Sequence, residues 1–276
     1  MPKPVSFQDY LVPAFSADES SRLPVTAVAA IIQHNTSGII SLKDSGITSP
    51  KGMEGHSYAT WDMPIEQAII KKVVTDDGGD YSKINLISTS VEDIKAALSS
   101  NIDSVWIYYA WDGIACELQG LDTNFFYFKD YSPELDDYSP VIIANNDFLK
   151  NNSEVAKKFM AALSKGYDYA IENPDDAAQI LVDANEGLDI ELCKKSQNWL
   201  ASQYKADADK WGVIDQKRWD AFYGWVYDNG LCEIDIPDGF GFSNDYRNKF
   251  CQQPPWLLTS GVKNGIIKNR EYFCQL

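Results

Sequence analysis

A single carboxylate follows an aromatic run in residues 105–113, VWIYYAWDG. The first six of these residues are apolar or aromatic and predict a buried strand, so Asp112 would lie just beyond the strand's end. A carboxylate accepts hydrogen bonds from an amino group, and aromatic rings hold a planar ligand between them. We predict ligand contacts from this segment, by Asp112, Trp111, Tyr109 and Tyr108.

The same residues also fit a purely structural role. Asp112 could be the N-cap of a helix over residues 113–119, since Asp is a favoured capping residue. Trp111 has helical spacing with apolar residues of that helix, which favours core packing at least as much as stacking on a ligand. These partners are Ile114, Ala115 and Leu118.

Two further polar segments follow predicted strands. In HNTSG (34–38), amide and hydroxyl groups could bind a ligand or form an ordinary turn; the candidates are Asn35, Thr36 and Ser37. TWDMP (60–64) precedes a helix whose free N–H groups suit a polar or anionic group, although Asp62 would partly occupy that place. The candidates there are Thr60 and Trp61, and surface packing is the alternative for the indole.

Alternating strands and helices position these residues. We predict strands at 24–32, 57–63, 84–89, 105–110, 124–128 and 139–145. Helices are predicted at 64–74, at 90–100 with Ser90 as its N-cap, and at 112–119. This order predicts an α/β fold with a mainly parallel sheet, in which ligands bind beyond the carboxyl ends of the strands.

After residue 145 the pattern becomes helical. Periodicity predicts helices at 153–172, from Pro174 onward with Asn173 as N-cap, at 189–204 and at 215–230. Four tryptophans in this part are predicted to be core residues: Trp199, Trp211, Trp219 and Trp225. Residues 251–276 lack clear periodicity and predict a C-terminal appendage.

Composition excludes several functions. The net charge of −16 disfavours binding to nucleic acid or to anionic membrane surfaces, which attract Lys and Arg. The five cysteines and two histidines have no metal-binding spacing, so we expect buried free thiols, no metal and no cofactor. No apolar run is long enough to span a membrane, and no signal peptide is visible.

Several segments together resemble a known family. VAAIIQHNTSGIISLKDSGITSPKGMEGHSYATWDMPIEQAII, VWIYYAWDGIACELQG, SPVIIANNDFL, KGYDYAIENPDDAAQILV and QYKADADKWGVID resemble substrate-binding proteins of ABC importers for the pyrimidine precursor of thiamine. The fungal hydroxymethylpyrimidine phosphate synthases belong to the same superfamily. The similarity covers residues 5 to about 250.

The resemblance implies a periplasmic-binding-protein-like α/β fold with two lobes and a ligand cleft between them. Residues 1–30 and 141–250 would form one lobe, incomplete at its N-terminus, and residues 31–140 the other. Phe7 and Gln8 would contribute to the cleft from the first lobe. Trp111 and Asp112 would recognise a hydroxymethyl- or formylamino-aminopyrimidine.

The resemblance also implies ABC permease subunits as partners and an extracytoplasmic location for the full-length form. Two other functions remain open at this point. One is a synthase-like enzyme, which would need a cysteine cluster that is absent from the sequence. The other is a two-lobed sensor domain without transport.

Overall fold

The computed structural model describes residues 18–247. The candidate ligand residues Phe7 and Gln8, and the predicted appendage 251–276, lie outside this range.

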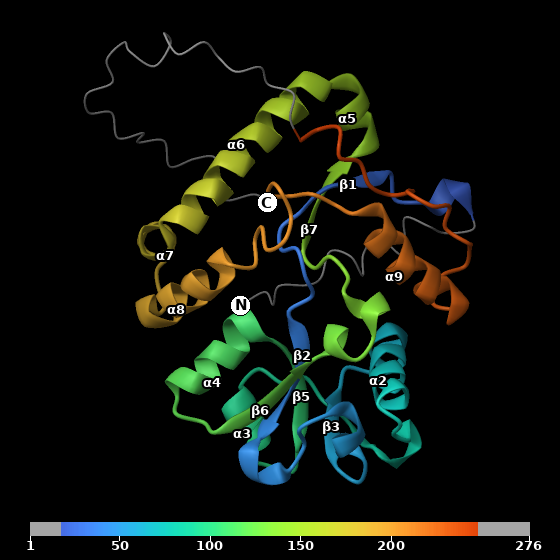
Figure 1. Cartoon of the computed structure of the whole chain (residues 1–276), viewed down its shortest axis with the longest axis vertical. Helices are drawn as coiled ribbons and strands as arrows, with labels where there is room; N and C mark the ends of the chain where they lie inside the picture. Colours follow the sequence, from blue (N-terminus) through green and yellow to red (C-terminus); the bar gives the residue numbers. More distant parts are fainter. Residues whose placement is uncertain (1–17, 248–276) are drawn as a thin grey trace.

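A mixed five-stranded sheet forms the half of the molecule that lies below in Figure 1. Its strand order is β4-β3-β5-β2-β6, where β3 pairs in parallel with β4 and β5, while β2 runs antiparallel to β5 and β6. The α/β class and a mainly parallel sheet are as predicted: β3, β4, β5 and β6 run in the same direction, while β2, a strand that was not predicted, runs opposite to them. The strands are β2 (Ser37–Leu42), β3 (Ser57–Thr60), β4 (Asn85–Ser88), β5 (Ser104–Tyr108) and β6 (Thr123–Tyr127).

Helices cover both faces of this sheet. One face packs against α2 (Pro64–Asp76), and buried side chains such as Tyr58 and Ile70 fill the space between them. The other face packs near α3 (Ile94–Leu98) and α4 (Ile114–Leu118), through Ile40, Val105 and Ile107 among others. Between β5 and α4 lies one turn of π-helix, η6 (Tyr109–Gly113).

A two-stranded antiparallel sheet organises the other half of the described chain. It consists of β1 (Val25–Ala30) and β7 (Val141–Asn145), and the residues after β7 are helical, as predicted. Figure 1 shows α6, α7 and α8 on one side of this sheet and α9 on the other. The helices are α5 (Asn146–Asn151), α6 (Ser153–Glu172), α7 (Pro174–Ala184), α8 (Ile190–Ala201) and α9 (Gln216–Asp228).

Two chain segments connect the halves (Figure 1). The first crossover, residues 31–36, joins β1 to β2, and the second, residues 128–140, joins β6 to β7. Short 3-10 turns complete the structure: η2 (Glu19–Ser21), η3 (Lys43–Ser45), η4 (Pro50–Met53), η5 (Tyr81–Lys83), η7 (Phe128–Asp130) and η8 (Pro133–Leu135).

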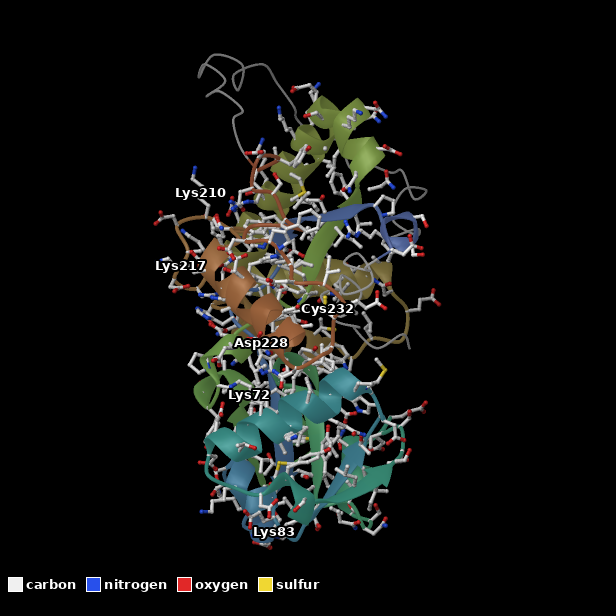
Figure 2. The ribbon with its side chains drawn as sticks, turned by 90° about the vertical axis from the view of Figure 1, so that its right-hand side faces the viewer. Lys72, Lys83, Lys210, Lys217, Asp228 and Cys232 are labelled. Carbon is white, nitrogen blue, oxygen red and sulfur yellow. The ribbon has the colours of Figure 1, made fainter. Side chains whose placement is uncertain are left out.

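A continuous apolar core runs through both halves on one side of the molecule. It includes Ile39 of β2, Tyr138 of the second crossover and Trp219 of α9, all buried. Figure 2 views this side and shows α9 above α2. Trp211, Trp219 and Trp225 are buried as predicted, whereas Trp199 is only partly buried.

The cysteines and the lengths of the helices can be compared with the sequence predictions. Cys116, Cys193 and Cys232 are free and buried, as predicted for them. Within residues 18–247 no helix combines the length and apolar character that a membrane span requires.

Candidate functional site

The predicted acid Asp112 lies inside a helix rather than at its start. β5 passes directly into η6, whose N-cap position is Tyr108, and η6 continues into α4. Asp112 therefore cannot be the N-cap of the following helix, and that structural alternative is wrong. It lies where β5 ends at its carboxyl edge, which is the usual place for ligands in such sheets. Single π-helical turns are frequent at functional sites.

The two tyrosines before Asp112 lie where the halves of the molecule meet. The Tyr108 hydroxyl is 3.4 Å from Ser139 Oγ in the second crossover. Tyr109 donates its hydroxyl hydrogen to Glu117, and its ring centroid lies 5.2 Å from that of Trp199 in α8. Burial, followed by the bond to Glu117, raises the pKa of Tyr109. Trp199 thus belongs partly to this contact between the halves.

At the end of β3, Thr60 and Trp61 have different environments. Thr60 is 1% exposed, and its hydroxyl donates to Glu66 Oε2 at 2.9 Å and accepts from the Asp62 amide at 3.0 Å. Trp61 is 44% exposed, and its ring centroid is 5.1 Å from that of Trp106 on β5. The indole is therefore available to a ligand, while the threonine hydroxyl already has partners within the chain.

Glu66 lies in the first turn of α2, and its side chain points into the protein. Its carboxylate is buried and accepts hydrogen bonds from Tyr58 Oη at 2.5 Å and from the Trp61 amide at 3.0 Å. Burial outweighs these bonds and raises the pKa of Glu66. We expected free N–H groups here, partly satisfied by Asp62, but Asp62 instead accepts a bond from the Ser88 hydroxyl. An anionic ligand group at this helix N-terminus would have to compete with Glu66.

The polar residues after β1 tie the two crossovers together. Asn35 Nδ2 donates to Leu135 O at 2.8 Å and to Asp137 Oδ1 at 2.7 Å, while Asn35 Oδ1 accepts from the amide and hydroxyl of Ser37. The Thr36 carbonyl accepts from the Tyr109 amide at 3.1 Å. Asn35, Thr36 and Ser37 are buried, and Ser37 already belongs to β2. For Asn35 and Ser37, these contacts match the turn-chemistry alternative.

A charged cluster beside these residues was not predicted. His34 Nδ1 lies 2.7 Å from Asp136 Oδ2, and its Nε2 lies 3.0 Å from Asp207 Oδ1. Arg218 of α9 lies 3.5 Å from Asp136. The bond to Asp136 raises the pKa of His34. Burial alone would raise the pKa of Asp136, but the bond from His34 and the charge of Arg218 outweigh it, and the pKa is lowered. The cluster joins both crossovers to the helical half.

The structure therefore brings together part of the predicted set. Trp61 lies beside Trp106, which was placed in a strand but not named as a site residue. The alternation of Trp106 and Tyr108 along β5 puts both on the same sheet face and could have identified it. Trp199 carried no comparable signal, since its contact with Tyr109 joins distant parts of the chain. The partners of Glu66 lie only five to eight residues before it, but the sequence did not mark this carboxylate as buried.

The sequence family described as NMT1/THI5 like matches residues 5–177, which is more than half of the chain. The chain belongs to the NMT1/THI5-like family. A formylaminopyrimidine-binding protein of Halalkalibacterium halodurans is 27% identical over 232 residues, which cover 82% of this chain and 68% of that protein. The family resemblance predicted from the sequence is confirmed.

Solved structures support the fold of this NMT1/THI5-like chain. The periplasmic aliphatic sulphonate binding protein SsuA from Escherichia coli is similar with a TM-score of 0.62 and 14% identity, over 96% of this chain and 80% of that one. The desulfurization enzyme DSZB is similar with a TM-score of 0.58 and 10% identity, over 86% and 81%. At these identities the likeness establishes the predicted periplasmic-binding-protein-like fold and nothing about the ligand.

Proposed function

We propose that this protein is the solute-binding component of an ABC importer and binds a neutral, planar thiamine pyrimidine precursor, such as hydroxymethylpyrimidine or formylaminopyrimidine. One arrangement carries the proposal: at the carboxyl ends of β3 and β5, the exposed indole of Trp61 packs on Trp106 above the buried Glu66. The ligand would lie between two lobes, residues 1–30 with 141–250 and residues 31–140.

Glu66 argues for a neutral ligand rather than a sulphonate. Its carboxylate already accepts from the Trp61 amide, a backbone donor near the start of α2. A sulphonate would find this backbone donor already bonded to Glu66, and a buried anion without hydrogen-bond donors is costly. A flat heterocycle instead gains from contact with the indole rings.

The relative from Halalkalibacterium halodurans supports the choice of heterocycle, since its name states formylaminopyrimidine binding. Asp112 would accept from the amino group of the pyrimidine, and Trp111 and Tyr108 would lie beside it. An importer component of this kind works with permease subunits, at an extracytoplasmic location.

We propose binding rather than catalysis. Burial raises the pKa of the Cys116 thiol to about 11, which keeps it protonated and a poor nucleophile. The likeness to DSZB concerns the fold alone.

Titration calorimetry tests this function. The chain is titrated with hydroxymethylpyrimidine, formylaminopyrimidine, thiamine and an alkanesulphonate, and we expect binding of the free pyrimidines and none of the sulphonate. Trp61→Ala should weaken pyrimidine binding by about tenfold, the scale of a lost aromatic contact of ~1.5 kcal/mol. Leu86→Ala removes another exposed apolar side chain, on β4, and serves as the matched control. Binding of the sulphonate alone, without either pyrimidine, would refute the proposal.

A further inference from the structure

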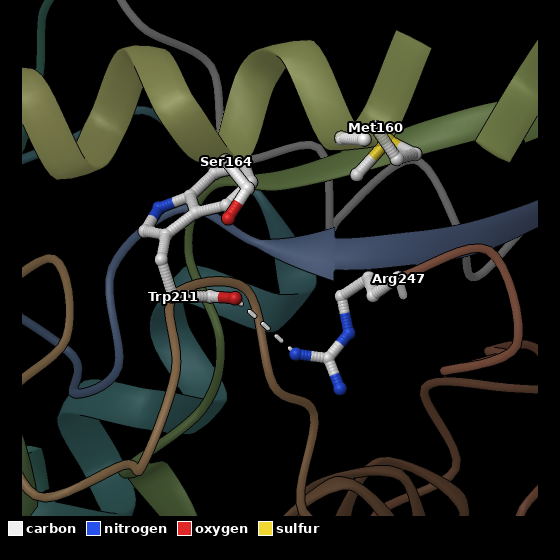
Figure 3. A pocket seen from close by; sticks show the side chains of 5 residues that line it. Met160, Ser164, Trp211 and Arg247 are labelled. Carbon is white, nitrogen blue, oxygen red and sulfur yellow. Dashed lines mark hydrogen bonds between the residues drawn. The ribbon is translucent and has the colours of Figure 1, made fainter. Parts of the chain in front are cut away.

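Arg247 lines a small hollow in the helical half, away from the residues discussed above. The other lining residues are Met160, Ala161 and Ser164 of α6, and Trp211. Figure 3 shows Met160 and Ser164 extending from α6 toward Trp211 and Arg247. The space that it offers to a water-sized particle measures about 10 Å³.

Within residues 18–247, no counter-charge lies against the guanidinium of Arg247. Its Nη1 donates to the Trp211 carbonyl at 3.3 Å, as the dashed line in Figure 3 marks. Its Nε is buried and has no hydrogen-bond partner within the described chain, where no carboxylate forms an ion pair with Arg247 either. Burial lowers the pKa of Arg247. A buried donor on a cation that stays unsatisfied is costly, so it calls for a partner.

The backbone holds Arg247 close to the wall of the hollow. Gly212 has a φ of 83° and is hydrogen-bonded through its carbonyl to Ala30 of β1. A Cβ on Gly212 would lie 3.2 Å from Arg247 Cδ, so the glycine permits this close approach. The aliphatic part of the Arg247 side chain therefore packs closely against Gly212.

We propose that this hollow binds a small monovalent anion of the size of chloride, held by the Arg247 guanidinium and the Ser164 hydroxyl. Organic ligands need larger pockets, of roughly 300 Å³ upward. The net charge of −16 repels a divalent anion twice as strongly as a monovalent one. Met160, Ala161 and the Trp211 ring form an apolar remainder, which suits a weakly hydrated ion.

Chlorine NMR tests this site without any pyrimidine, because exchange of chloride with a protein site broadens its resonance. At constant ionic strength, we expect excess broadening with the wild-type chain that falls about tenfold in Arg247→Gln, the scale of a lost charge-assisted hydrogen bond. Lys210→Gln removes the same charge one residue before Trp211, at an exposed position seen in Figure 2, and should keep the broadening. Bromide should displace chloride, and sulfate should not.

Three results would overturn the proposal: no excess broadening in the wild type, an equal loss in Lys210→Gln, or displacement by sulfate. Ser164→Ala keeps both the charge and the helix, and it should reduce the broadening severalfold. If melting curves show that Arg247→Gln is unfolded, Ser164→Ala alone tests the anion site. Unchanged broadening in Ser164→Ala would then refute the site.

Discussion

Protonation of His34 should stabilise the junction between the two halves, and replacing His34 by Gln should remove that effect. Both ring nitrogens of His34 face carboxylates, of Asp136 and Asp207, so only the protonated ring can donate to both. The bond to Asp136 raises the pKa of His34 above its usual 6.5. Its stabilisation is therefore complete below about pH 6.5 and is lost as the pH rises through the raised pKa.

The size of the effect follows from the exposure of the partners. His34 is 26% and Asp136 20% exposed, so their charged hydrogen bond should contribute ~1.5–3 kcal/mol. Asp207 is 69% exposed, and its contact should contribute only ~0–1 kcal/mol. Gln retains a neutral hydrogen bond worth ~1 kcal/mol, so His34→Gln should cost about 1–2 kcal/mol at about pH 5.5.

The lowered pKa of Asp136 sets the acidic limit of the window. Its stabilisation is present above the usual carboxyl pKa of 3.8 and is lost as the pH falls through the lowered value. At about pH 9 the wild-type ring is neutral and keeps one N–H donor, so the difference from Gln should shrink to ~0.5 kcal/mol or less.

Urea unfolding of the wild type and His34→Gln at about pH 5.5 and about pH 9 measures this difference directly. Subtracting the two proteins at each pH removes the titration of all other groups. His56→Gln is the control, because His56 lies 3.5 Å from Asp103 at the surface and should cost little at either pH. An equal cost for His34→Gln at both pH values, or a larger cost at alkaline pH, would refute the reasoning.

Three further substitutions test packing and hydrogen bonding in the structure. Glu66→Gln presents an amide donor to the groups that donate to Glu66, and should lower the free energy of unfolding by ~1–3 kcal/mol in a denaturant titration. A cost below about 0.5 kcal/mol would mean that these bonds are not formed. Gly38→Ala should lower the melting temperature sharply, because the added Cβ would lie 2.0 Å from the Phe126 carbonyl oxygen. Gly166→Ala is the control: nothing lies within 4 Å of its added Cβ on α6, so it should raise the free energy of unfolding by ~0.5–1 kcal/mol. Equal melting temperatures for both alanine variants would contradict this.

Local patterns predicted most helices because the information lies within them. α6 has the predicted bounds, and Pro64 begins α2 as its fixed φ favours. The start of α3 was wrong: Asp93, not Ser90, accepts from the Ala96 amide as N-cap. Both are good capping residues, and only the packing of the helix on β5 selects between them.

Long-range contacts decided what the sequence could not predict. The sequence predicts a polar loop at residues 34–38, which includes the first two residues of β2, because Ser37 and Gly38 are poor strand formers. The strand forms since Gly38 admits the Phe126 carbonyl from β6, a contact between residues far apart in the chain. Glu66 was not predicted as a site residue, and groups of β3 six and eight residues before it enclose its carboxylate.

The place of Asp112 within a helix makes Asp112→Ala a sharper test than it would be at a helix end. At an N-cap, alanine would lower stability by ~1 kcal/mol and obscure any effect on binding. Inside η6 and α4, alanine has the best helix propensity, and the substitution removes no capping bond. If Asp112 accepts from the amino group of a pyrimidine, affinity should fall by ~1.5–3 kcal/mol in calorimetry. Glu92→Ala, which removes an exposed carboxylate just before α3, is the control for the loss of a carboxylate and should leave affinity within about twofold. Unchanged pyrimidine affinity in Asp112→Ala, with a folded protein, would remove Asp112 from the site while leaving the proposed function to Trp61 and Trp106.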